Sequence, residues 1–261
     1  MATERRVTPP WLRTWVRNGL RRARRIPLAF RDRPSFVCPW CAYRGKFLDE
    51  RQPSGIRVNA RCPGCGALER HRLQRCVLDE LFQKHDPRSF SVLHFAPESM
   101  VADYLRARCA HYLAADLAPA TGQVHADIRD LQFAHGSFDL VYASHVLEHV
   151  DRDRQALSEV RRVLRSGGLA VLPVPLVAER TVEYPTAERG THGHVRAPGR
   201  DYFARYEELF SQVILRSSAD YPERFQLHVY EDRSVFPNAR APYRPPMVGT
   251  RHEEVVPICR A

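Results

Sequence analysis

Residues 138–175 read FDLVYASHVLEHVDRDRQALSEVRRVLRSGGLAVLPVP, and this stretch decides the fold. The run at 141–144 is apolar and ends in small and polar residues, which is typical of a buried parallel strand. A helix is predicted from Asp151, because the apolar side chains that follow share one helical face. Gly167 and Gly168 are predicted to end that helix, and LAVLPVP has the pattern of a second buried strand. The order strand, helix, strand predicts one βαβ unit of a doubly wound α/β sheet.

The sequence motifs of this unit are also informative. FDLV, HVLEHV and RVLRSGG resemble the fourth and fifth strands of class I methyltransferases, which use S-adenosylmethionine (SAM). The resemblance implies a Rossmann-like doubly wound sheet. In that arrangement HYLAAD at 111–116 is the second strand, and EEVVPIC at 253–259 is the last, antiparallel strand.

Length and charge narrow the class of protein. A chain of 261 residues can hold one α/β domain with a small module beside it. No apolar run reaches the ~18 residues of a membrane span, and the N-terminus lacks the apolar core of a signal peptide, so we expect a cytoplasmic protein. Ten arginines in residues 1–33 are balanced only by Glu4 and Asp32, so most of the net charge of +10 belongs to this segment.

Residues 1–33 have the pattern of a basic amphipathic helix. Trp11, Trp15 and Leu20 recur at helical spacing with arginines between them, and Thr8 before a proline is a typical helix start. Such a helix packs on its own domain, lies on an anionic membrane surface as a peripheral anchor, or binds RNA phosphates. The sequence leaves these alternatives open.

Cysteines form the second strong pattern, CPWC and CPGC. Each CxxC turn directs two thiolates at one ion, so we predict a structural Zn²⁺ in a zinc ribbon. Disulfides are the alternative, which a reducing compartment disfavours. A site of four thiolates has no open position, so the ion is expected to stabilise the fold. The predicted ligands are Cys38, Cys41, Cys62 and Cys65, whereas Cys76, Cys109 and Cys259 are expected to be buried apolar residues.

The chain is therefore expected to have four parts. Residues 1–33 are the basic segment, 34–67 the zinc ribbon, 68–89 a linking helix with apolar residues at helical spacing, and 90–261 the SAM-dependent methyltransferase domain. The motifs CPGCGALERHRL and VLHFAPES resemble those of a bacterial group of type 11-like methyltransferases, which have a zinc ribbon and an HFAPE-like first loop. This resemblance covers about residues 36–215.

The loop after the first predicted strand departs from the usual methyltransferase pattern. A glycine-rich loop normally lets the backbone approach the methionine part of SAM, but this chain reads HFAPE. The resemblance implies that His94, Ala96 and Glu98 contact SAM, Ala96 by being small and Glu98 by accepting a hydrogen bond from the amino group. A domain that binds another ligand, or none, is the alternative.

The other predicted cofactor residues follow later strands. Asp116 ends the second strand, where a carboxylate accepts two hydrogen bonds from a ribose diol. The resemblance implies that Asp127 binds the adenine amine and that Ile128 packs against the ring. Ser144 ends the fourth strand, at the edge where open α/β sheets bind ligands. A turn cap is the alternative role for each Asp.

Methyl transfer is an in-line displacement, so alignment comes first and a base is needed only where the acceptor loses a proton. His145 is the predicted base, because imidazole is available in neutral form near pH 7; a role in loop structure is the alternative. His149 is expected to be a packed structural residue. The polar stretch 181–196 is predicted to be an acceptor-binding lid with these side chains to offer: Glu183, Tyr184, His192, His194 and Arg196.

These observations favour a SAM-dependent methyltransferase that acts on oxygen or nitrogen of a small or medium metabolite. One alternative is an rRNA or tRNA methyltransferase, since the chain is basic and some rRNA enzymes place a cysteine module before this fold. The other is a catalytically silent binding module that uses its ribbon and basic segment for partners. The sequence names neither the acceptor nor the oligomeric state.

Overall fold

The computed structural model describes residues 35–261 except 53–54, 121–122 and 189–192. The predicted N-terminal helix, with its membrane and RNA alternatives, falls outside the described residues, and so does His192. Among the residues that are described, no helix is both long and apolar enough to cross a bilayer.

A seven-stranded sheet forms the centre, in the order β12-β15-β9-β8-β5-β6-β7. All neighbouring strands are parallel except where β15 lies antiparallel between β9 and β12. This arrangement confirms the predicted Rossmann-like sheet and its antiparallel last strand. The strands are β5 (Ser91–Phe95), β6 (His111–Asp116), β7 (Val124–His125), β8 (Phe138–Ala143), β9 (Leu164–Val171), β12 (Gln212–Ser217) and β15 (Val255–Arg260).

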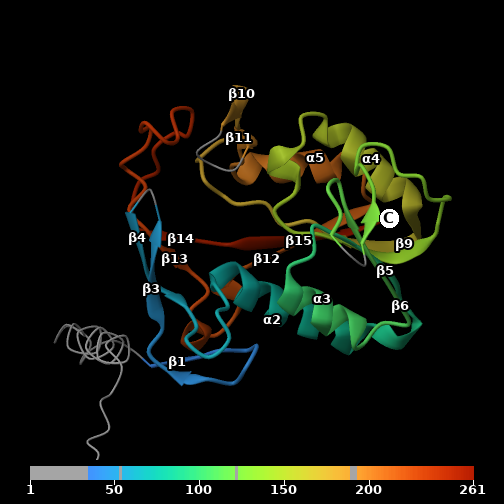
Figure 1. The fold of residues 1–261 in the computed structure, drawn as a ribbon, viewed down its shortest axis with the longest axis horizontal. Helices are drawn as coiled ribbons and strands as arrows, with labels where there is room; N and C mark the ends of the chain where they lie inside the picture. Colours follow the sequence, from blue (N-terminus) through green and yellow to red (C-terminus); the bar gives the residue numbers. More distant parts are fainter. Residues whose placement is uncertain (1–34, 53–54, 121–122, 189–192) are drawn as a thin grey trace, which may run out of the picture. The chain divides into compact units, whose positions relative to one another are not determined.

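Helices cover both faces of this sheet (Figure 1). One face packs against α2 (Glu69–Lys84) and α3 (Ser99–Arg106), through a core that includes Leu73 and Val77. The other packs against α4 (Asp153–Val163) and α5 (Ala204–Glu207), through a core that includes Leu157 and Val160. The apolar spacing of α2 and α4 places these side chains on the sheet-facing side.

The deciding βαβ unit forms as predicted, but its boundaries differ. Asp151 does not cap α4: the N-cap is Arg152, and the Asp151 carboxylate accepts hydrogen bonds from the Arg152 backbone and from Arg129. The helix ends at Val163, and β9 begins directly after it. The glycine pair therefore lies inside the strand, where Gly167 has φ of +75°, a backbone conformation that favours glycine.

The cysteine module consists of two small hairpins. In the first, β1 (Phe36–Val37) pairs antiparallel with β2 (Arg44–Gly45), and the CPWC turn lies between them. In the second, β3 (Leu48–Gln52) pairs antiparallel with β4 (Gly55–Arg61), and the CPGC turn follows. This is the hairpin arrangement expected of a zinc ribbon.

Several buried contacts join this module to the start of α2. The Arg72 side chain is fully buried and donates to the carbonyls of Ala60, Ala67 and Gln226. The indole Nε1 of Trp40 donates to the carbonyl of His71 at 2.6 Å. Residues 36–261 thus form one compact unit, in which the module and the sheet share the helix α2.

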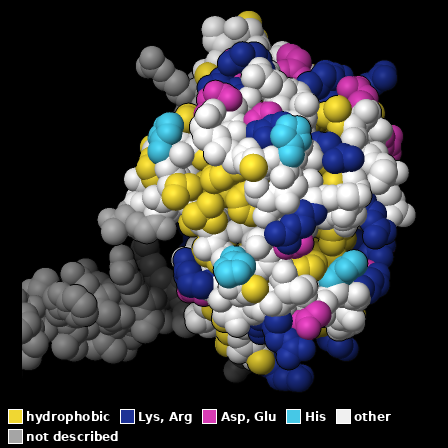
Figure 2. All heavy atoms as spheres, turned by 90° about the vertical axis from the view of Figure 1, so that its right-hand side faces the viewer, with side chains coloured by type: hydrophobic (Ala, Val, Ile, Leu, Met, Phe, Trp, Pro, Cys, Tyr) yellow, Lys and Arg dark blue, Asp and Glu magenta, His cyan; other side chains and the backbone are white. Residues whose placement is uncertain are grey.

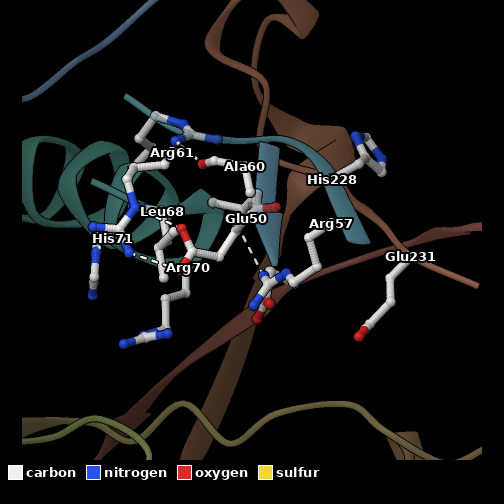
Figure 3. A network of polar contacts seen from close by, with 12 residues as sticks. Glu50, Arg57, Ala60, Arg61, Leu68, Arg70, His71, His228 and Glu231 are labelled. Carbon is white, nitrogen blue, oxygen red and sulfur yellow. Dashed lines mark hydrogen bonds and ion pairs between the residues drawn. The ribbon is translucent and has the colours of Figure 1, made fainter. Parts of the chain in front are cut away.

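The ion pairs around this junction are drawn in Figure 3. Arg57 of β4 donates to the carboxylate of Glu69 at 2.9 Å, and Glu69 is completely buried. Nδ1 of His71 accepts from the backbone of Leu68 at 3.1 Å. Because buried charges are costly unless they are paired, these contacts fix how the module meets the helix.

The predicted lid forms a hairpin of β10 (Val182–Glu188) and β11 (His194–Ala197). The chain then continues through a 3₁₀ helix at Arg200–Phe203 and, after β12, through the short antiparallel pair β13 (Val229–Tyr230) and β14 (Arg251–His252). Of the isolated cysteines, Cys76 and Cys259 are buried as predicted and Cys109 is half-buried.

Charge on the described body is mixed. On the face that Figure 2 shows, Lys and Arg side chains alternate with acidic ones and with hydrophobic patches. That face therefore presents no uniform basic surface, in line with the concentration of positive charge in residues 1–33.

Candidate functional site

A cavity of about 340 Å³ opens at the carboxyl ends of β5, β6 and β8. This is the edge at which open parallel sheets bind ligands, and the volume is within the range of small-molecule sites. Most of the lining is apolar, with a few polar groups. The lining residues are Phe95, Ala96, Asp116, Leu117, Ala126, Asp127, Ile128, Arg129, His145, Val146, His149 and Val150.

Five of the eight residues that the sequence singled out for cofactor binding or catalysis line this cavity. Ala96 follows β5, Asp116 ends β6, Asp127 and Ile128 follow β7, and His145 follows β8. The strand order brings them together, because neighbouring parallel strands end at one edge of the sheet.

Each of the two aspartates also caps the turn in which it lies. Asp116 accepts a hydrogen bond from the backbone of Ala118 at 2.9 Å. Asp127 accepts from the backbone of Arg129 at 2.9 Å and pairs with its guanidinium, whose hydrogen bonds lower the pKa of Asp127. Both carboxylates thus combine the turn-capping role with a place in the cavity wall.

Two residues of the wall have left-handed backbones. Ala96 has φ of +45° and His145 has φ of +56°, in a region that side chains with a Cβ rarely adopt. Ala96 therefore makes the turn for which other first loops use glycine, while keeping its side chain small. Its amide donates to the carbonyl of Ala115 at 2.9 Å, which ties the loop to β6.

His145 forms a pair with Glu148, a residue that the sequence analysis did not assign. Nδ1 of His145 lies 3.2 Å from Oε1 of Glu148, whose side chain is 1% exposed. Burial raises the pKa of Glu148, but the hydrogen bond from His145 and the neighbouring imidazoles outweigh burial and lower it, so the carboxylate is ionised. A carboxylate that accepts from Nδ1 leaves Nε2 as the basic nitrogen, and Nε2 has no partner among the described residues.

The other three predicted cofactor residues do not line the cavity. His94 is buried, and its Nδ1 lies 2.9 Å from the hydroxyl of Tyr112; burial lowers the pKa of His94 to about 3. Ser144 accepts from Nε2 of Gln74 at 2.7 Å. One polar atom of each residue already has a protein partner, and the assignments of His94 and Ser144 to SAM stay predictions.

Glu98 lies under α2 instead of in the cavity wall. Its Oε1 accepts from Arg70 at 2.8 Å and lies 2.9 Å from Nε2 of His71, whereas Oε2 is buried and lacks a partner in the described part of the chain. Burial raises the pKa of Glu98, but the contacts with His71 and Arg70 prevail and hold it at about 2. Its predicted contact with the amino group of SAM stays a prediction.

Two charged groups of the predicted lid are already engaged, whereas the hydroxyl of Tyr184 is buried and has no partner in the described part of the chain. Arg196 is 2% exposed and donates to the carbonyls of Leu147 and Val150, which fixes β11 on the short 3₁₀ helix η3 (Leu147–His149). Glu183 pairs with Arg196 and Arg205. The hairpin therefore covers one end of the site without offering these charges to a ligand.

Sequence reasoning missed several contributors. Glu148 stands inside the quoted HVLEHV, and its spacing of three residues from His145 was a usable signal, because such residues lie on one face of a helical turn. Arg129 directly follows the predicted pair Asp127 and Ile128 in the sequence. Gln74 and Arg70 had no comparable signal, because they reach Ser144 and Glu98 from α2 only after the chain has folded.

The four predicted metal ligands lie together in the cysteine module. One sulfur from each lies within 4.8 Å of the other three. Sγ of Cys38 is 3.6 Å from Sγ of Cys65, and Sγ of Cys41 is 3.6 Å from Sγ of Cys62. Zn–S bonds of about 2.3 Å in a tetrahedron place two sulfurs roughly 3.8 Å apart, so the donor set and its spacing suit zinc.

Comparison with known proteins agrees with the fold. Residues 96–172 match the family described as methyltransferase domain. The matched segment runs from the first cavity loop to the end of β9, and it contains every cavity-lining residue except Phe95. This part of the chain is therefore similar to a methyltransferase domain.

Curated relatives match only part of this chain. The chain is 47% identical over 60 residues to a demethylmenaquinone methyltransferase of Clavibacter sepedonicus, covering 21% of this chain and 24% of that protein. It is 34% identical over 102 residues to the O-methyltransferase cnsE of Penicillium expansum, covering 38% and 30%. An uncharacterized 37.1 kDa protein in transposon TN4556 of Streptomyces fradiae is 41% identical over 70 residues, covering 27% and 20%. The chain spans less than a third of the length of each of these relatives.

Among solved structures, a putative methyltransferase of Bacillus halodurans aligns with a TM-score of 0.49 at 17% identity, covering 70% of this chain and 97% of that chain. A SAM-dependent methyltransferase of Mesorhizobium loti aligns with a TM-score of 0.46 at 15% identity, covering 72% and 98%.

Proposed function

We propose that this protein transfers the methyl group of SAM to an oxygen or nitrogen atom of a small or medium metabolite. The observation that carries the proposal is the cavity at the carboxyl edge of the sheet, where Asp116, Asp127 and His145 stand in a largely apolar wall. Two of the relatives that match part of this chain are named as a demethylmenaquinone methyltransferase and an O-methyltransferase, which supports the proposal.

The cavity residues suit the parts of SAM. In this proposal Asp116, which lines the cavity, accepts hydrogen bonds from the ribose hydroxyls. Asp127 and Ile128, which also line it, bind the adenine, one as acceptor and the other as an apolar surface. Ala96 turns without a bulky side chain, which leaves room for the sulfonium end of the cofactor.

SAM supplies an electrophilic methyl group on a sulfonium sulfur. The protein aligns the acceptor atom with the methyl carbon, and this alignment alone can supply several kcal/mol of the lowering of the barrier. The new bond joins that carbon to oxygen or nitrogen, the electron pair of the broken bond stays on sulfur, and the proton of the acceptor leaves. In this proposal His145 takes the proton at Nε2, and Glu148 stabilises the imidazolium through Nδ1.

Titration of the purified protein with S-adenosylhomocysteine tests the proposal. Asp116→Ala should weaken binding by roughly 1.5–3 kcal/mol, the scale of lost hydrogen bonds to a charged group. Asp139→Ala, at the start of β8 and outside the cavity lining, is the matched control and should bind as the wild type does. No binding by the wild type would favour the silent module, and unchanged affinity in Asp116→Ala would remove Asp116 from the site.

The cysteine cluster is proposed to hold a structural Zn²⁺ through Cys38, Cys41, Cys62 and Cys65. The sulfur spacing and the absence of disulfides among the described cysteines support this proposal. Elemental analysis of reduced protein should find zinc that Cys62→Ser loses; protein without zinc or iron would overturn it.

A further inference from the structure

Three possible metal ligands meet beside the cavity, far from the cysteine cluster in sequence. Glu148 and His149 come from η3, and His194 comes from β11. One ligand atom from each lies within 4.8 Å of the other two. The carboxylate of Glu148 is 4.0 Å from Nε2 of His149, and the rings of His149 and His194 have centroids 4.7 Å apart.

The buried carboxylate of Glu148 is the strongest evidence for a bound cation at this point. Its side chain is 1% exposed, Oε1 lies against Nδ1 of His145, and within the described chain Oε2 has no hydrogen-bond partner. Removing a carboxylate from water costs several kcal/mol unless its oxygens are satisfied. A cation between this carboxylate and the two imidazoles would satisfy it.

The scaffold holds these ligands in fixed positions. The buried guanidinium of Arg196 donates to the Val150 carbonyl at 2.6 Å and to the Leu147 carbonyl, which joins the strand of His194 to the turn that carries Glu148 and His149. Two chain segments more than forty residues apart therefore present their donors to one point. Such support from outside the ligand set is what a metal site requires.

We propose that Glu148, His149 and His194 form a second metal site, for a divalent transition ion such as Zn²⁺. Two imidazoles and one carboxylate are the ligand set of reactive zinc and non-haem iron sites, which keep open positions, unlike a site of four thiolates. Metal–ligand bonds of about 2.0–2.2 Å place donors roughly 3–4 Å apart, so modest side-chain rotations would close the set. His149 also lines the cavity, so the proposed ion would lie beside it.

This location gives the ion a role on the acceptor side, a role that rests on the proposed methyl transfer. An ion here lowers the pKa of a hydroxyl group that it binds, next to the imidazole of His145. The site thus favours acceptors with a hydroxyl or carboxylate that can bind a metal.

Metal counting tests the site without SAM or acceptor. The full chain, reduced and stripped by a chelator, is titrated with Zn²⁺ alone, desalted and analysed for metal. We expect two equivalents in the wild type and one in His194→Ala and in Glu148→Gln, because loss of a ligand should weaken binding at least tenfold, the lower end of the effect of outer-shell partners. His135→Ala, which changes an exposed histidine, is the matched control and should keep both equivalents.

Cobalt separates the two sites by spectrum. Thiolate charge-transfer bands report the cysteine cluster, whereas a nitrogen and oxygen site adds only weak visible bands. His194→Ala should keep the thiolate bands and lose the added ones, with a circular dichroism spectrum like that of the wild type.

Saturation of the wild type at one equivalent, or a second equivalent that survives in the folded His194→Ala protein, would overturn the proposal. If Glu148→Gln does not fold, His194→Ala decides alone. A positive metal count with no binding of S-adenosylhomocysteine would refute the proposed function but not this site.

Discussion

Ala96 and His145 are strained in the same way, and both stand in the wall of the cavity. A left-handed backbone costs a residue with a Cβ about 1–2 kcal/mol, so it persists only where the surrounding structure imposes it. The amide of His145 donates to the carbonyl of Pro173 at 2.9 Å, as that of Ala96 does to Ala115. Neighbouring strands therefore hold both turns, which point the two side chains at one space.

His145 carries the prediction that concerns chemistry. With an acceptor that must lose a proton, His145→Ala should lower turnover by roughly a hundredfold, because general-base catalysis is worth about that much or more. Binding of S-adenosylhomocysteine should stay close to that of the wild type. Single-turnover rates and titration calorimetry on the same protein check both parts, and normal turnover would return His145 to a role in loop structure.

Glu98 carries a prediction about acid. Its pKa of about 2 in the folded protein lies below the ordinary value of 4.5, so its ion pairs stabilise the fold fully above pH 4.5 and are lost as pH falls toward 2. Glu98→Gln should therefore cost roughly 2–3 kcal/mol at pH 7, and the difference from wild type should shrink between pH 5 and pH 3. Urea unfolding at several pH values measures this difference, and a constant gap would contradict the assignment.

For single residues, the sequence predicted the cavity residues that directly follow strands. It missed contacts with residues that lie on other elements. Asp116, Asp127 and His145 were found because strand ends can be read from the pattern of apolar residues. Glu98 was placed at the right loop, yet its contacts with Arg70 and His71 depend on where α2 packs. No local pattern encodes that packing.

Among the elements, α2 contacts both the sheet and the cysteine module. It packs on the sheet through its apolar face, and its first turn meets the cysteine module. Arg72 makes the central contact: it donates to backbone carbonyls of the module and of the segment before β13, and stacks 4.5 Å from the ring of Phe47. The helix is therefore shared by the two parts that it joins.

Replacing this guanidinium tests how much the junction contributes. Arg72→Met should lower the free energy of unfolding by roughly 3–5 kcal/mol, because several buried carbonyls lose their donor. Lys84→Met, at the exposed end of the same helix, is the matched control and should change it by about 0.5 kcal/mol or less. Denaturant unfolding compares the two, and equal effects would contradict the central role of Arg72.

Element types were easier to predict than element boundaries. The helix α4 and the strands on either side of it follow from periodicity, but the sequence placed the glycine pair at the helix end. In the structure β9 starts earlier, because Leu164 pairs with Phe138 of β8 before the register shifts. Pairing with a neighbouring strand overrode the local stop signal.

For the whole molecule, the metal proposed for the cysteine module should affect the proposed cofactor site. Trp40, between two of the cysteines, donates to the carbonyl of His71, and the ring of His71 contacts Glu98 next to the cavity loop. Cys62→Ser should therefore lower the melting temperature and the affinity for S-adenosylhomocysteine together, without a selective loss of chemistry. Thermal unfolding and calorimetry on one preparation measure both.

Cys109→Ser is the matched control for that change, since Cys109 is isolated and only half-buried. It should leave metal content and affinity unchanged. A Cys62→Ser protein that keeps its metal, or loses stability with full affinity for S-adenosylhomocysteine, would separate the module from the cofactor site.

The sequence predicted the cysteine module and the central sheet, but it did not predict how the two pack together. The CxxC pairs and the strand pattern are each local signals. The packing of the module against α2 relies on single long side chains, such as Arg57 and Arg72, that find partners far along the chain. Periodicity does not report such pairs.

The position of β15 has a consequence for how the protein is made. This strand lies between β9 and β12, although residues 255–260 are translated long after β9. At synthesis rates of roughly 5–20 residues per second, the edge of β9 stays unpaired for about 5–15 seconds on the ribosome. An unpaired apolar strand edge recruits other strands. Yield in cells should therefore depend more on chaperones and on the rate of translation than on the stability of the finished fold.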